Sequence, residues 1–104
     1  MSGYSWPDEG SGLAGARARA AWLATCRALP LGTRITGVVV GRRPFGVFLQ
    51  ISGAPDAVGL AEITGAPPNA VLPALGEPVS GEVIWWAHHN RQVKIKLTEW
   101  KVRL

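Results

Sequence analysis

Short stretches in which apolar and polar residues alternate make up most of the chain after Pro30. In residues 91–97 the apolar side chains of Val93, Ile95 and Leu97 alternate with polar ones, and residues 45–51 show the same period of two. This period is typical of β-strands with one buried face. The pattern predicts five strands, at residues 33–41, 45–51, 59–63, 79–87 and 91–97. Glycine and proline mark the turns between them, including residues 52–58, so we expect a closed antiparallel barrel.

The segment before Pro30 has a different pattern. Residues 13–29 are rich in Ala, Leu and Arg, which favour helix, and Trp22, Cys26 and Leu29 have the spacing of one apolar helix face, with Leu23 beside them. We expect this helix to dock onto the barrel. The predicted parts are a flexible leader, a helix and a barrel domain, at residues 1–12, 13–29 and 30–104.

Composition narrows the class of partner. The 104 residues fit a single domain, and 47% of them are apolar, which favours a folded globular domain. Eleven Lys and Arg against seven Asp and Glu give a net charge of +4. Several of the cations lie close to the C-terminus, at Arg91, Lys94, Lys96, Lys101 and Arg103. A basic domain favours polyanionic partners such as nucleic acid, although an incidentally basic protein is an alternative.

Cysteine content and apolar runs bear on location. The single cysteine, Cys26, excludes an internal disulfide, which is typical of a cytoplasmic protein. No apolar run is long enough for a membrane span, and the first residues lack the pattern of a signal peptide. We therefore expect a cytoplasmic domain with no membrane partner.

Six sequence elements between residues 30 and 98 then occur in a recognisable order. They are Gly32, Gly37-Val38-Val39, Phe45-Gly46-Val47-Phe48-Leu49, Gly59-Leu60-Ala61-Glu62-Ile63-Thr64, Gly76-Glu77-Pro78-Val79 with Val83, and Lys94-Ile95-Lys96-Leu97-Thr98. Together they resemble the S1 RNA-binding domain, an OB-fold module. The resemblance implies an all-β fold, a five-stranded OB-fold antiparallel barrel, here with an N-terminal α-helical extension, and it implies RNA binding.

The sequence departs from the family pattern at three positions. Glu62 stands where the family often has a histidine on the third strand, and Ala87 stands where an acidic residue commonly ends the fourth. Arg42 replaces a side chain that is usually aliphatic. These differences bear on function, so the resemblance supports the fold more strongly than the binding site.

Aromatic side chains are the candidate stacking surfaces for bases. Phe48 shares its parity with Gln50, so we expect it to face solvent, the alternative being that it lies under the N-terminal helix. Phe45 has the parity of the core but follows Pro44, where a bulge could turn it outward; both placements stay open. Parity along an unbroken strand places Trp85 inward, which leaves Trp86 as the outward candidate unless the helix or tail covers it.

Cations beside these rings are the candidate phosphate contacts. They are Arg34, Arg42, Arg43, Lys94 and Lys96, with Arg91 as a further member. Each alone is compatible with a solvated surface, but as a group near outward aromatics they favour binding of single-stranded nucleic acid.

Catalytic and metal chemistry find no support in the sequence. The chain has no nucleophile elbow, no paired carboxylates and no phosphate-binding loop, so we do not expect an enzyme. Adjacent His88 and His89 diverge on a tight turn without a further ligand nearby, so neither a metal nor another cofactor is expected.

The sequence thus predicts an RNA-binding protein with little sequence preference, for which single-stranded DNA is an alternative ligand. The competing hypothesis is a protein-interaction or homodimerisation module whose nucleic-acid face is covered. Glu62, Ala87 and the five tryptophans favour that alternative, because Trp6, Trp22 and Trp100 could cover the barrel face.

Overall fold

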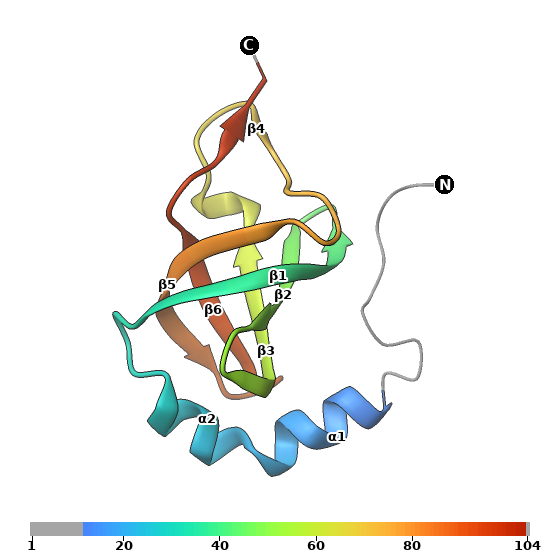
Figure 1. Ribbon diagram of the computed structural model, residues 1–104, viewed down its shortest axis with the longest axis vertical. Coiled ribbons are helices and arrows are strands. Elements are labelled where there is room, and N and C mark those ends of the chain that lie inside the picture. The colour runs from blue at the N-terminus through green and yellow to red at the C-terminus, as the bar shows by residue number, and fades with distance from the viewer. Residues whose placement is uncertain (1–11, 104) are drawn as a thin grey trace.

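A computed structural model describes residues 12–103, with the side chains of residues 12–15 left out of the description. It contains a closed barrel of five strands (Figure 1). These are β1 (Arg34–Arg43), β2 (Gly46–Ile51), β3 (Ala54–Glu62), β5 (Pro78–Ala87) and β6 (Gln92–Leu97). All five predicted strands are present. β3 begins at Ala54, however, because the predicted turn at residues 52–58 closes within Ser52 and Gly53.

The strands close in the order β1-β2-β3-β6-β5, with β5 returning to β1. Antiparallel pairing holds for every neighbouring pair except β3 and β6, which run parallel through Gly59 with Val93 and Leu60 with Lys94. This single parallel pair lets five strands close into a barrel. The all-β prediction is confirmed, while the antiparallel description needs this exception.

Alternation fills the barrel interior as expected. Val39, Val47, Leu49, Val83 and Val93 are almost fully buried in one apolar cluster. Gly46 allows β2 and β3 to approach at their shared edge, because a Cβ atom there would lie 2.3 Å from the carbonyl oxygen of Ala61. The glycine between Phe45 and Val47 is therefore required for the close pairing of β2 with β3.

Two helices lie across one end of the barrel, where a single helix was expected (Figure 1). They are α1 (Gly12–Ala20) and α2 (Trp22–Ala28), interrupted by a turn at Ala21. Both pack against β3. The predicted leader lies outside the described residues apart from Gly12, which begins α1.

The buried side of α2 carries the predicted stripe with one change. Trp22, Thr25 and Leu29 are buried and Cys26 is half-buried, whereas Leu23 is 72% exposed. The Trp22 Nε1–H group donates a hydrogen bond of 2.9 Å to Nδ1 of His88, in the turn between β5 and β6. Docking of the helix onto the barrel is confirmed.

The remaining elements lie at the other end of the barrel (Figure 1). They are the 3₁₀ turn η1 (Ile63–Gly65) and a two-stranded ribbon of β4 (Ala70–Val71) and β7 (Lys101–Val102). The ribbon brings the C-terminal segment back over the loop between β3 and β5. It therefore holds Trp100 against the barrel, where this side chain packs on the apolar cluster.

Candidate nucleic-acid interface

One row of side chains crosses four strands on the outer surface of the barrel. Phe48 on β2 pairs with Leu60 on β3, Leu60 pairs with Lys94 on β6, and Lys94 pairs with Trp85 on β5. Paired residues on neighbouring strands point to the same face of a sheet. Two aromatic residues, one aliphatic residue and one lysine therefore follow one another across the four strands on the same face.

Phe48 does not face solvent in this row. Its neighbours Val47 and Leu49 fill the interior, so the predicted outward parity is right, yet Phe48 is only 6% exposed and Leu60 beside it 3%. The Phe48 ring also lies edge-on to Phe45, with ring centroids 6.0 Å apart. The expectation of a solvent-exposed Phe48 is wrong because packing on the outer surface, and not only inside the barrel, buries this ring.

Phe45 is the exposed member of this aromatic pair. It precedes β2, its side chain is 48% exposed, and its carbonyl oxygen accepts a 2.8 Å hydrogen bond from the backbone N–H of Ile63. That bond anchors the backbone of Phe45 to the start of η1. Of the two placements that the sequence left open, the structure has the outward one.

The adjacent tryptophans on β5 exchange the roles expected from parity. The pairing of β5 with β6 shifts between Val83 and Trp85, which breaks the alternation. Trp85 is consequently 60% exposed, whereas Trp86 is half-buried against the apolar cluster. The Trp86 Nε1–H group donates to the carbonyl oxygen of Leu29 at 2.9 Å. Trp86 is therefore a docking residue for α2, and Trp85 is the outward tryptophan that sequence reasoning missed.

Lys94 is paired with Trp85 on the neighbouring strand and forms an ion pair with Glu62. Its Nζ atom is 3.3 Å from Oε1 of Glu62, and the two side chains are 20% and 46% exposed respectively. Glu62 is paired with Gly46, directly beside Phe45. The carboxylate of Glu62, at the position where the resemblance to the S1 domain implies a histidine, thus faces Lys94, the single cation of the row.

The other predicted cations are distributed unevenly around this row. Arg42 is half-buried, and its guanidinium donates to the carbonyl oxygen of Leu72 at 3.4 Å. This contact gives Arg42 a structural role at the end of the barrel that the sequence did not indicate. Arg43 pairs with Gly46, which places it on the same edge as Glu62.

Arg34 and Lys96 form a second, parallel row. Both are exposed, and both pair with Glu82 on β5. Arg91 lies in the turn before β6 with a φ of 54° and is half-buried. The surface across β1, β5 and β6 therefore carries cations, but Glu82 lies between Arg34 and Lys96 in the second row, and Glu62 on β3 forms an ion pair with Lys94 of the first.

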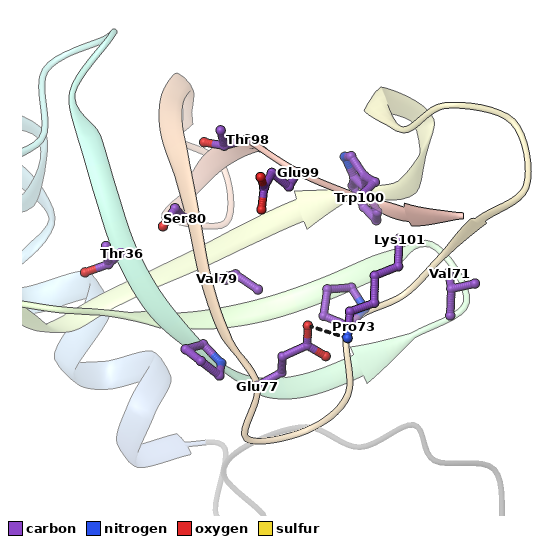
Figure 2. Close-up of a pocket in the computed structure, with 11 residues that line it drawn as sticks. Thr36, Val71, Pro73, Glu77, Val79, Ser80, Thr98, Glu99, Trp100 and Lys101 are labelled. Carbon is purple, nitrogen blue, oxygen red and sulfur yellow. Dashed lines mark ion pairs between the residues drawn. The ribbon is translucent and has the colours of Figure 1, made fainter. Parts of the chain in front are cut away.

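A separate groove of about 790 Å³ lies between the start of β5 and the C-terminal segment (Figure 2). Trp100 and Glu99 border it on one side, and Pro73 borders it on another. The Lys101 Nζ atom lies 3.5 Å from Oε2 of Glu77 within this groove. Trp100 therefore belongs to a different surface from Trp85.

Cys26 and His88, whose side chains could act as a nucleophile or a metal ligand, are part of the packing between α2 and the barrel. Burial raises the pKa of the Cys26 thiol, which disfavours the reactive thiolate. His88 accepts the Trp22 hydrogen bond, and its ring lies at 86° to the Trp22 ring. Within residues 12–103 no group of three or more His, Cys, Asp or Glu side chains is arranged to hold a metal, and no helix has the length and apolar character to cross a membrane.

Sequence comparison identifies no relative, because no protein-family model matches the chain and no curated protein is similar to it. Structural comparison does find similar folds. Mycoplasma genitalium RNase R in complex with ribose methylated single-stranded RNA matches 79% of this chain with a TM-score of 0.65 at 14% identity. The matched region is 15% of that chain, so this domain corresponds to a small part of RNase R.

Two smaller proteins give similar results. GSP13 from Bacillus subtilis matches 66% of this chain and 55% of its own, with a TM-score of 0.55 at 19% identity. A chain of the a/eIF2alpha–aDim2p–rRNA complex from Pyrococcus horikoshii matches 64% of this chain and 43% of its own, with a TM-score of 0.54 at 19% identity. With the closed five-stranded barrel, these similarities define the fold as an S1-like OB-fold.

Proposed function

We propose that this domain binds single-stranded or structured RNA with little sequence preference, using base stacking and phosphate contacts. The observation that carries the proposal is the exposed Trp85 side chain on β5, whose partner on the neighbouring strand β6 is the cation Lys94. An uncovered aromatic ring next to a cation is the arrangement that holds an unpaired base and its phosphate. Two of the structural neighbours come from complexes with RNA, one with single-stranded RNA and one with rRNA.

We assign the stacking and phosphate-contact roles from where the aromatic and basic side chains lie on the barrel. Trp85 and Phe45 offer exposed rings for bases, and Phe48 supports Phe45 from beneath through the edge-on contact. We assign the phosphate contacts to Lys94, Lys96, Arg43 and Arg34. Their positions on strands that pair with the strands carrying the aromatic rings support this assignment. Arg42 and Trp86 shape the barrel and its helix instead.

The test is a fluorescence anisotropy titration of a labelled RNA oligomer at two salt concentrations. We expect salt-sensitive binding, with a log–log slope of about −0.7 for each phosphate neutralised. Trp85→Ala should weaken binding by about 5- to 150-fold, since stacking contributes about 1–3 kcal/mol per base. Leu23→Ala is the matched control, because Leu23 is 72% exposed on α2 and lies outside the row.

Absence of salt-sensitive binding would contradict the proposal, as would equal affinities for the Trp85→Ala and Leu23→Ala proteins. A DNA oligomer of the same sequence, titrated in parallel, decides between the two nucleic acids. Tighter RNA binding would indicate a contact to the 2′-hydroxyl.

A protein-interaction module is the second candidate function. The buried Phe48 and the Glu62–Lys94 ion pair favour it, because both remove binding capacity from the face that the family uses. Ile84 and Trp85, consecutive and 49% and 60% exposed, would then form the contact. Sedimentation of the purified chain tests self-association. A dimer dissociated by Trp85→Ala would support this function over RNA binding.

A further inference from the structure

We infer that Glu62 competes with nucleic-acid phosphates for Lys94, so that the ion pair limits affinity and must open when RNA binds. The inference rests on the proposed function, and it assigns to Glu62 the role of lowering the RNA affinity of the same site. Its basis is the 3.3 Å contact between Lys94 Nζ and Glu62 Oε1 in the middle of the candidate interface.

The position of Glu62 makes it a competitor and not a remote charge. It pairs with Gly46, so its side chain leaves β3 beside Phe45, and Lys94 lies one strand further on, paired with Trp85. A phosphate that follows bases stacked on Phe45 and Trp85 would pass over this carboxylate. Like charges repel there, and the phosphate must also replace the carboxylate as the partner of Lys94.

The exposed fractions of the two side chains indicate that a phosphate can replace the Glu62 carboxylate as the partner of Lys94. Glu62 is 46% exposed, so its carboxylate can turn into water without being left buried and unpaired. Lys94 is only 20% exposed, and on its strand it is paired with Leu60 on one side and with Trp85 on the other. The ammonium group is therefore held in place while the carboxylate is free to leave it. An ion pair of this exposure is weak enough for a phosphate to displace.

Glu62→Gln tests the inference directly. The amide keeps the size of the side chain but removes the charge. The RNA titration above should then show about 1.5- to 5-fold tighter binding at low salt, the range expected for an exposed ion pair. The salt slope should also steepen by about 0.7, because Lys94 would act as one additional uncompensated cation against phosphate.

Glu99→Gln is the matched control. It makes the same change in net charge, but Glu99 borders the separate groove of Figure 2. We expect its affinity and slope to equal those of the wild type. Equal tightening by Glu62→Gln and Glu99→Gln would overturn the inference, because it would indicate a general charge effect.

Lys94→Gln completes the test. If the ion pair with Glu62 keeps Lys94 from contacting phosphate, Lys94→Gln should weaken RNA binding more in the Glu62→Gln protein than in the wild type. Equal losses in the two backgrounds would overturn the inference while leaving the proposed function intact. Lack of salt-sensitive binding by every variant would instead contradict the proposed function itself. Binding by Glu62→Gln alone would support the inference in its strongest form.

Discussion

Trp85 and Trp86 show how one irregularity in a strand separates two identical side chains by role. The shift between Val83 and Trp85 turns the first indole to solvent and the second toward the helix. Trp86 then supplies its N–H to the carbonyl oxygen of Leu29, at the C-terminal end of α2. A carbonyl at a helix end lacks an intrahelical partner, so the indole satisfies a group that would otherwise need water.

Trp86→Phe should therefore lower the free energy of unfolding by at least about 1 kcal/mol, because an aromatic ring remains while the hydrogen bond and part of the packed indole are lost. The measurement is urea unfolding followed by circular dichroism. Trp85→Phe is the matched control and should change stability by less than about 0.5 kcal/mol, as for other exposed positions. Equal losses for the two variants would show that the Leu29 contact does not stabilise the protein.

At the scale of single residues, the sequence predicted parity but not exposure. Alternation correctly placed Phe48 on the outer surface, yet its packing with Phe45 and Leu60 depends on residues that pairing brings together. Trp85 was assigned inward because a strand irregularity leaves no local mark in a run of apolar residues. The sequence indicated Glu62 and Lys94 separately but not their contact, since the two residues are 32 positions apart and lie on strands paired in parallel.

At the scale of elements, α2 is attached to the turn between β5 and β6 by the Trp22–His88 hydrogen bond. A double-mutant cycle measures this attachment. Trp22→Phe and His88→Ala should each destabilise the protein, and the double variant should lose about 0.5–1.5 kcal/mol less than their sum. His89→Ala is the control, because His89 is exposed in the same turn. Strict additivity of the two losses would contradict a direct bond.

The elements themselves were largely readable from the sequence. Period-two alternation located the strands because each has one face in the barrel interior. The start of β3 was missed because Pro55 and Asp56 are residues typical of turns, although here they lie within a strand. The break at Ala21 was missed because alanine favours helix, and no local signal marks the turn. The parallel pairing of β3 with β6 is a property of barrel closure, which no single segment encodes.

At the scale of the whole molecule, helices and barrel share one core. Trp22 and Leu29 belong to the same apolar cluster as Val47, Val83 and Val93. Elements that bury one another in this way unfold together, since neither retains its core when the other leaves. The N-terminal extension should therefore behave as part of the domain and not as an independent appendage.

Trp22→Ala tests this coupling because it removes the largest helical contribution to the cluster. We expect a loss of about 3–5 kcal/mol, the usual range for a buried tryptophan, against less than about 0.5 kcal/mol for the exposed neighbour in Leu23→Ala. Thermal unfolding is followed by far-ultraviolet circular dichroism for the helices and by tryptophan fluorescence for the barrel. Both signals should shift to the same lower midpoint. If the helical signal alone moved, the helices would be a separate unit, and Trp86 would lie exposed before the barrel itself unfolded.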